Sequence, residues 1–384
     1  MNAQNYGFIY NELVIDPIQN RLIKRTRRSL IDGESSTTAT AIQQRKEGEM
    51  KLRKEIQFYM SIQGGDCHIP PPFVMPRFYA SSVASSASSP ELHIQYFADY
   101  EPLTERFPYT TTTTTVIREI LDHIRPLHEH SPRIRITNEE YIQALRVEVY
   151  DKIVERYSSV DWKNIYPEFE RLTHVNGLKV RSFMEYATII RDRINALGSP
   201  ATNNITIHHS NPPLGGGTPA TNSGRSLTYI HGDTHLGNIL VPKLGVCIDS
   251  DTPQYVFIDP RGYFASYDIF GDPHYDYAKL LFGISGYSRF DQMTIERCEV
   301  NEAVTDVTDL PEMNITIPFI DEYSSIYKSL DTPEWKSSVP ELTNELTRLI
   351  SLSIWLGNNS TFISPEKKLM SLMISRYLCE RFLV

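Results

Sequence analysis

Residues 229–240 read YIHGDTHLGNIL, and this stretch places two histidines, an aspartate and an asparagine between apolar ends. Short β-rich runs flank it at 226–230 and 238–241. The polar side chains are therefore expected in a loop held by strands, which is a common position for reactive groups. A polar turn, a histidine metal cluster and a catalytic loop are the three interpretations that these residue types allow.

A further carboxylate, Asp259, ends the next predicted strand, at 255–258. The strands are spaced for hairpins, and hairpin pairing would bring Asp259 close to Asn238. Together with Asp233 they would form an oxygen-rich cluster. Such a cluster suits a hard cation such as Mg²⁺, for which few protein ligands suffice when phosphates supply the rest.

The motifs around this cluster form an ordered series. HGDTHLGN has the His-x-Asp-x-x-x-x-Asn spacing of kinase catalytic loops, and it is followed by FIDPRG and then by GDPHYDYAKLL. This series resembles the aminoglycoside phosphotransferase and choline kinase superfamily. It is most similar to the phosphotransferase-like proteins of bacterial capsular or surface polysaccharide pathways. The resemblance covers about residues 226–290, and three ordered motifs are more specific than any one of them.

The resemblance implies roles for the matching residues. Asp233 matches the catalytic aspartate, which would hold the acceptor hydroxyl in line with the γ-phosphate of ATP. Because phosphoryl transfer depends mainly on positioning, Asp233 would accept the hydroxyl proton late. Asn238 and Asp259 match the two Mg²⁺ ligands. His231 would be a scaffold residue that ties the loop to the neighbouring strand by hydrogen bonds.

Two residues beside this set have alternative interpretations. His235 is predicted to touch the γ-phosphate or the substrate, and the alternative is a histidine that only packs the loop. Arg261 would contact a phosphate or an anionic substrate. Alternatively, it would pair with a carboxylate such as Asp268.

A nucleotide site also needs a cation for the α- and β-phosphates of ATP, and Lys24 in RLIKRT is the candidate. Its neighbour Arg25 alternates to the other face of the predicted strand. Glu55, on the front helix, would form an ion pair that positions Lys24, and Glu49 is the competing choice. Lysine and glutamate on such elements are also common as solvated surface residues.

The adenine base is expected near IQYFADYEPL, where backbone groups between Tyr96 and Ala98 would bind it. One feature departs from the kinase pattern. No glycine-rich loop precedes FIYNELVID, and only Gly7 is available there. This departure is compatible with a shortened first strand, with weak nucleotide binding, or with a catalytically silent kinase-like module.

Other phosphate-handling classes fit the motifs less well. GDTH and GDPH resemble the Gly-Asp motifs of metallophosphoesterases, but the Gly-Asp-x-x-Asp and Gly-Asn-His motifs of that class are absent. CIDSDTP resembles the aspartate-nucleophile phosphatases, but Thr252 stands one position too early. A protein kinase would carry Asp-Phe-Gly, Ala-Pro-Glu and an activation segment between them, and neither motif occurs.

Composition narrows the remaining classes. The chain has 384 residues, of which 40% are hydrophobic, so it can build a substantial core. Its net charge of -9 disfavours a general nucleic-acid binder. The 4 cysteines show no zinc or disulfide spacing, which suits a reducing compartment. No run approaches the roughly 20 apolar residues that span a bilayer. We therefore expect a cytoplasmic protein with no membrane span and no nucleic-acid partner.

The elements that must position these residues follow from periodicity and turn signals. A front part is predicted to contain a hairpin (8–16 and 21–26), a helix (47–62) and a strand (91–100). Met50, Ile56, Phe58, Tyr59 and Ile62 are the expected apolar face of that helix. From residue 101 we expect helices at 116–130, 138–158, 162–173 and 181–197, the short strands named above, and mostly helix after 272. Hairpin spacing argues against a doubly wound parallel sheet.

The sequence thus predicts an α+β, bilobal, protein kinase-like fold. A small β-rich N-lobe (1–100) would bind the nucleotide. A larger, mostly helical C-lobe (101–384) would carry the catalytic loop, the metal site and the acceptor site, with a flexible insert at 198–224. The predicted reaction is Mg²⁺-dependent transfer of the ATP γ-phosphate to a hydroxyl of a sugar, an amino sugar or an amino alcohol. A silent nucleotide-binding module is the alternative, and a metallophosphoesterase is less favoured.

Overall fold

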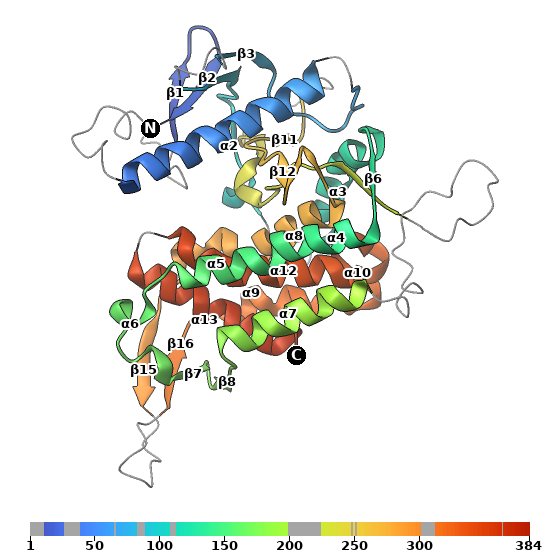
Figure 1. Ribbon diagram of the computed structural model, residues 1–384. Coiled ribbons are helices and arrows are strands. Elements are labelled where there is room, and N and C mark those ends of the chain that lie inside the picture. The colour runs from blue at the N-terminus through green and yellow to red at the C-terminus, as the bar shows by residue number, and fades with distance from the viewer. Residues whose placement is uncertain are drawn as a thin grey trace, which may run out of the picture. The chain divides into compact units, whose positions relative to one another are not determined.

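The structure is a computed structural model of the chain (Figure 1). It describes residues 11–26, 39–64, 67–82, 89–107, 113–198, 224–246, 249, 252–300, 312–362 and 364–384. Gly7 and most of the predicted insert, residues 199–223, lie outside the described residues. The chain divides into two compact units: residues 1–108, 115–133 and 228–273 form the first, and residues 109–114, 134–227 and 274–384 form the second. Every candidate site residue belongs to the first unit.

A four-stranded antiparallel sheet opens the first unit, with the strand order β1-β2-β4-β3. The strands are β1 (Asn11–Asp16), β2 (Arg21–Thr26), β3 (Phe78–Ser82) and β4 (Glu91–Gln95). The turn between β1 and β2 depends on Asp16, whose carboxylate accepts the N–H groups of Ile18 and Gln19 at 3.1 Å. Such side-chain bonds are why aspartate favours turns. The predicted hairpin is confirmed for the described residues.

Helix α2 (Ala39–Gln63) runs across this sheet (Figure 1) and contacts β2, β3 and β4. Leu52, Ile56 and Tyr59 are fully buried at helical spacing, and Phe58 is buried beside them. This apolar face fixes the rotation of α2 about its axis. It therefore fixes the direction in which Glu55, which lies between these residues, points.

The prediction for this helix needs two corrections. α2 begins at Ala39, before the predicted start at Glu47, because alanine, glutamine, arginine and lysine have high helix propensity in a stretch that resembled a polar loop. Met50 is not part of the buried face, since it is 47% exposed, and Leu52 takes that role.

Two short pairings hold the polar loop. β10 (Ile239–Pro242) lies between β11 (Val256–Phe257) and β5 (Tyr100–Pro102), antiparallel to both. Ile239 pairs with Phe257, and the Ile258 N–H donates to the Asn238 carbonyl at 2.9 Å. The hairpin that was predicted to join the two polar segments is therefore confirmed.

The rest of the first unit consists of short elements around this loop. They are α3 (Thr113–His130, which starts in the second unit), the hairpin of β12 (Tyr263–Phe264) and β13 (Tyr267–Asp268), and β14 (Phe270–Gly271), which pairs with β9 (Arg225–Tyr229). β9 also pairs with β6 (Ile134–Ile136). The β12–β13 hairpin begins four residues after Asp259 in the chain.

The second unit is mostly helical. Its helices are α4 (Asn138–Leu145), a π-helical turn (Arg146–Asp151), α5 (Lys152–Ser158), α6 (Trp162–Ile165), α7 (Phe183–Leu197), α8 (Pro273–Ile284), α9 (Ile320–Ser329), α10 (Pro333–Ser338), α11 (Pro340–Thr343), α12 (Glu345–Gly357) and α13 (Pro365–Phe382). Trp355 is fully buried, and its indole N–H donates to Ser285 at 2.9 Å. No helix of the described chain is long and apolar enough to cross a membrane.

A sheet in this unit was missed by the prediction. β15 (Glu296–Val300), β16 (Met313–Thr316), β7 (Leu172–Val175) and β8 (Leu178–Lys179) form it in that order. The helix predicted over 162–173 is therefore wrong beyond α6. Strands this short carry too little alternation to be recognised, and β7 pairs with the sequence-distant β16. The α+β fold class is nevertheless confirmed, with a β-rich N-terminal part and a mostly helical C-terminal part.

Candidate active site

The Lys24 ammonium group is the centre of the polar cluster. Its Nζ lies 2.6 Å from Glu55 Oε2 and also donates to the carboxylate of Asp259. Lys24 is 7% exposed and Glu55 is 4% exposed. A strand, a helix and the segment after β11 thus supply one charged side chain each, and all three meet at one point.

Burial and charge act against each other in this cluster. Burial lowers the pKa of Lys24, but Asp259 and Glu55 outweigh it and raise that pKa above its usual value. Burial raises the pKa of Glu55 to about 7, although Lys24 lowers it. Lys24 is therefore held as a cation. Glu55, in contrast, has a pKa close to neutral pH, because the effect of burial on its pKa is larger than the attraction of Lys24.

The structure separates the two candidate partners of Lys24. The Glu49 carboxylate accepts from Arg45 at 2.9 Å and from Ser89 at 3.0 Å, so its contacts lie elsewhere. Arg25, the neighbour of Lys24, pairs with Glu12 at 2.7 Å on the other face of β2. The alternation expected along the strand thus directs the lysine, and not the arginine, toward α2.

Asp259 has an unusual backbone conformation for a non-glycine residue, with φ of 57°. Such left-handed positions cost free energy and are concentrated at functional sites. The preceding N–H, that of Ile258, is bound to the Asn238 carbonyl, so Asp259 begins its turn next to the polar loop that contains Asn238. Its side chain is 40% exposed, in contrast to Lys24 and Glu55.

Asn238 is joined to Asp233 by its side chain. Asn238 Nδ2 donates to the Asp233 carbonyl at 2.9 Å and to Asp233 Oδ2 at 3.2 Å. Both acceptors are oxygens, so the amide nitrogen faces Asp233 and the amide oxygen points away from it. Asn238 therefore orients the Asp233 carboxylate and keeps an oxygen for another ligand.

His235 lies beside the same carboxylate, with Nε2 at 3.8 Å from Asp233 Oδ2. Its Nδ1 accepts the N–H of Gly237 at 3.1 Å. Because Nδ1 accepts, the neutral ring carries its proton on Nε2, which faces Asp233. The ring is thus fixed in the loop and directed at the candidate catalytic group.

His231 is fully buried and ties the loop to the segment after Asp259. Its carbonyl accepts the Arg261 N–H at 2.8 Å, and its Nδ1 accepts the Asp233 N–H at 3.3 Å. The guanidinium carbon of Arg261 lies 3.9 Å from the centre of the Tyr263 ring. Asp268, the partner considered for Arg261, accepts a hydrogen bond from Lys54.

The segment expected to bind adenine is partly occupied by protein contacts. The Tyr96 N–H donates to the Asn20 carbonyl at 3.0 Å, and the Ala98 carbonyl accepts from Lys243 Nζ at 2.6 Å. The Tyr96 carbonyl and the Ala98 N–H have no protein partner in the described part of the chain. A base would therefore have to use these groups, or displace Lys243.

The donor set near Asp259 suits Mg²⁺. Within the described residues, the second carboxylate oxygen of Asp259 and the amide oxygen of Asn238 have no protein hydrogen-bond partner. The same residues contain no group of three or more His, Cys, Asp or Glu side chains placed to hold a metal. A site with only two protein oxygens is typical of Mg²⁺ sites in which phosphate oxygens and water supply the remaining ligands.

Three residues near the cluster were missed as a set from the sequence: Lys54, Tyr263 and Asp268. They bring the β12–β13 hairpin and α2 together, as described below. The only signal for them was the run YFASYD, in which aromatic residues flank a small polar turn.

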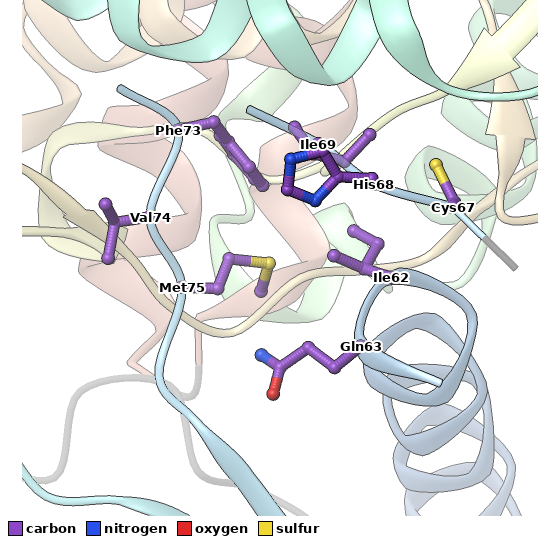
Figure 2. A pocket seen from close by; sticks show the side chains of 8 residues that line it. All are labelled: Ile62, Gln63, Cys67, His68, Ile69, Phe73, Val74 and Met75. Atoms are coloured by element: carbon purple, nitrogen blue, oxygen red, sulfur yellow. The ribbon is translucent and has the colours of Figure 1, made fainter. Parts of the chain in front are cut away.

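A separate cavity of about 230 Å³ lies at the C-terminal end of α2. Figure 2 shows it between Ile62 and Gln63 of the helix and the segment with Phe73, Val74 and Met75. Most of its lining residues are apolar, but polar atoms form the larger part of its accessible wall. The Gln63 amide is already bonded to Pro76 and Phe78 at 2.8 and 2.7 Å. None of the candidate site residues lines this cavity.

No family model and no curated protein matches the chain. Several solved structures are similar to it. A glucosamine kinase (crystal form B) has 13% identity and a TM-score of 0.46, over 86% of this chain and 69% of that one. A glucosamine kinase in complex with glucosamine, ADP and inorganic phosphate has 11% identity and a TM-score of 0.47, over 97% and 80%. The streptomycin-ATP-APH(2")-IIa ternary complex has 11% identity and a TM-score of 0.43, over 97% and 88%. Likeness at this level carries no argument about activity, so the function is argued from the site itself.

Proposed function

We propose that this protein is an ATP-dependent kinase that phosphorylates a hydroxyl group of a small molecule. The observation that carries the proposal is the buried Lys24, held at once by Glu55 on α2 and by Asp259 after β11. A buried ammonium group that joins two carboxylates costs desolvation free energy. Binding of nucleotide phosphates explains why such a cation would be held there, because the carboxylates fix its position and keep it charged.

In this proposal Lys24 binds the α- and β-phosphates of ATP. Glu55 would hold the lysine in place during binding, and the more exposed Asp259 would be available as a ligand of a metal ion. Asn238 and Asp259 would hold Mg²⁺ through the two oxygens that lack protein partners. Bound there, Mg²⁺ would neutralise the phosphate charge that develops during transfer.

Asp233 would act on the acceptor. Its carboxylate, oriented by Asn238, accepts a hydrogen bond from the acceptor hydroxyl and aligns the oxygen with the γ-phosphorus. The hydroxyl oxygen forms the new P–O bond as the bond to ADP breaks, and its proton passes to Asp233. His235, fixed by Gly237, would hold the carboxylate from the other side or contact the transferred phosphate. Arg261 would contribute positive charge to the phosphate side.

The acceptor class rests on the motif resemblance alone. We propose a sugar, an amino sugar or an amino alcohol, in a pathway of surface polysaccharides. The cysteine usage supports a cytoplasmic location. Tyr96 and Ala98 would bind the base through the carbonyl and the N–H that remain available.

The test is an ADP-release assay with ATP, Mg²⁺ and a panel of sugars, amino sugars and amino alcohols. We expect turnover with at least one acceptor, and a loss of about 100-fold or more for Asp233→Asn and for Asp259→Asn. Asp122→Asn is the matched control, because Asp122 pairs with Arg125 within α3, at 2.6 Å. Full turnover by both site variants would refute the mechanism.

A catalytically silent nucleotide-binding module is the second candidate. The sequence before FIYNELVID favours it, because that stretch lacks the glycine-rich loop that would hold the phosphates for transfer. Calorimetric titration with ATP and Mg²⁺ separates the two candidates. Binding without turnover on any acceptor would support the module, and turnover would exclude it.

A further inference from the structure

We propose that the β12–β13 hairpin, residues 263–268, is a clasp that holds α2 against the catalytic loop, with Lys54 and Asp268 as its positioning residues. The inference deepens the proposed function and rests on it, because α2 carries Glu55. Within the described chain, the hairpin stands between Asp259 and α8, where a protein kinase would have a long activation segment. It would keep Glu55 in place without any modification.

The side-chain half of the clasp is centred on Lys54. Its ammonium group donates to the carboxylate of Asp268 on β13 and lies 5.3 Å from the ring centre of Tyr263 on β12. Tyr263 and Asp268 face each other across the hairpin. A single lysine of α2 therefore contacts both strands, by an ion pair and by a cation–π contact.

The backbone half is centred on Gly262, which has φ of 65°. A Cβ atom there would lie 3.0 Å from the Lys54 carbonyl oxygen and 3.1 Å from Phe58 Cβ. The start of the hairpin thus touches the backbone of α2 more closely than any other residue type would allow. The lysine contact and the glycine contact fall on the same turn of the helix, next to Glu55.

The hairpin is also joined to the catalytic loop at both of its ends. At the start, the Arg261 N–H donates to the His231 carbonyl at 2.8 Å. At the end, the Ile269 N–H donates to the Gly262 carbonyl at 2.7 Å, and the Ile230 N–H donates to the Ile269 carbonyl at 3.1 Å. The clasp therefore connects α2 to Ile230 and His231, the two residues that come before Gly232.

The Lys54 and Asp268 side chains are 25% and 45% exposed, so water weakens their attraction. The clasp is thus expected to bias the position of α2 and not to determine whether the chain folds. Loss of one partner should increase the fraction of molecules in which α2 moves away, by about two- to fivefold, the range that a partly exposed ion pair supports. ATP affinity falls in proportion to the fraction of molecules in which α2 stays in place, and therefore by at most the same factor.

The experiment compares Lys54→Ala, Asp268→Ala, the double variant and Lys54→Arg with the wild-type protein. The control is Arg45→Ala, which removes an ion pair to Glu49 whose two partners both lie on α2. Hydrogen exchange of the α2 amides is measured on the ATP-free protein, and KM for ATP, KM for the acceptor and kcat are measured in turnover.

We expect faster exchange in α2 and a higher KM for ATP in both single alanine variants, with little change in the KM for the acceptor. The double variant should resemble the single ones, because they remove the same contact. Lys54→Arg should restore both readouts, and Arg45→Ala should match the wild type. The clasp would be overturned if Lys54→Ala left both the α2 exchange rates and the KM for ATP unchanged. It would also be overturned if Arg45→Ala changed them as much as Lys54→Ala does. Absence of turnover in the wild type would count against the proposed function, and the exchange data would still decide the clasp.

Discussion

Replacing Glu55 with glutamine is expected to remove a pH dependence from the folding stability. The pKa of Glu55 rises from 4.5 to about 7 because burial outweighs the attraction of Lys24. Between these values the folded chain binds the Glu55 proton more tightly than the unfolded chain does. The contribution of Glu55 to stability is therefore complete below about pH 4.5, and it is lost as the pH rises through about 7.

The magnitude follows from that difference in pKa. At 1.36 kcal/mol for each pH unit, the change from 4.5 to about 7 corresponds to about 3 kcal/mol of unfolding free energy. Glutamine has nearly the same shape as glutamate and cannot ionise. The variant therefore does not lose unfolding free energy as the pH rises through about 7. The unfolding free energy of Glu55→Gln minus that of the wild type should therefore increase by about 3 kcal/mol between pH 4.5 and pH 8.

Urea unfolding, followed by far-ultraviolet circular dichroism at a series of pH values, measures this difference, because α2 contributes to the helical signal. Glu49→Gln is the control, because Glu49 lies on the same helix and its carboxylate is bound by Arg45 and Ser89. Above about pH 7, where Glu55 is ionised, the Glu55 variant should also lose turnover, by about ten- to a hundredfold, since it replaces a hydrogen bond between charged groups. Stability curves that run parallel for Glu55→Gln and the wild type would refute the reasoning.

Three further variants test other parts of the site. His235→Ala should lower kcat by about tenfold, because the ring lies beside the proposed catalytic carboxylate of Asp233; unchanged kcat and KM would leave only a packing role. Gly262→Ala should cost about 2–3 kcal/mol of unfolding free energy, from its left-handed backbone and the close approach to α2. Gly177→Ala is the matched control: its φ is 75° but nothing lies within 4 Å, so it should lose only about 1–2 kcal/mol, and equal losses would contradict the close contact. Lys24→Met should bind Mg²⁺ about tenfold more tightly than the wild type in the absence of ATP, because a nearby cation is removed. Titration calorimetry with Arg25→Met as control measures this, and equal affinities would argue against a metal ligand next to the lysine.

Local patterns were sufficient to predict which polar side chains lie near one another. Lys24 and Arg25 were separated by strand alternation, and the structure places them on opposite faces of β2. Asp233, Asn238 and Asp259 were grouped by a motif and by one expected hairpin, which β10 and β11 form. These predictions depend on residues within one strand, one loop or two neighbouring strands, for which the sequence spacing determines the geometry.

Features that depend on distant partners could not be predicted in this way. Nothing in α2 indicates that Lys54 would find Asp268, which follows it by more than half of the chain. Ala98 and Lys243 are 145 residues apart, so the contact that occupies part of the candidate base-binding segment was not foreseen either. The same reason explains the missed pairing of β7 with β16. Hydrophobic periodicity gives the faces of elements, but it does not say which polar side chains meet across them.

Asp259 takes part in two arrangements that exclude each other in part. Its carboxylate accepts a hydrogen bond from Lys24, and the same side chain is the proposed Mg²⁺ ligand. A dication close to the lysine would be repelled by it, at about 4 kcal/mol for two unit charges 4 Å apart near a protein surface. The phosphates of ATP remove this conflict, because they attract both cations and let Lys24 turn from Asp259 toward the nucleotide. The metal is therefore expected to enter with ATP and not before it. Glu55, which is buried and keeps its contact with Lys24, would hold the lysine during that exchange.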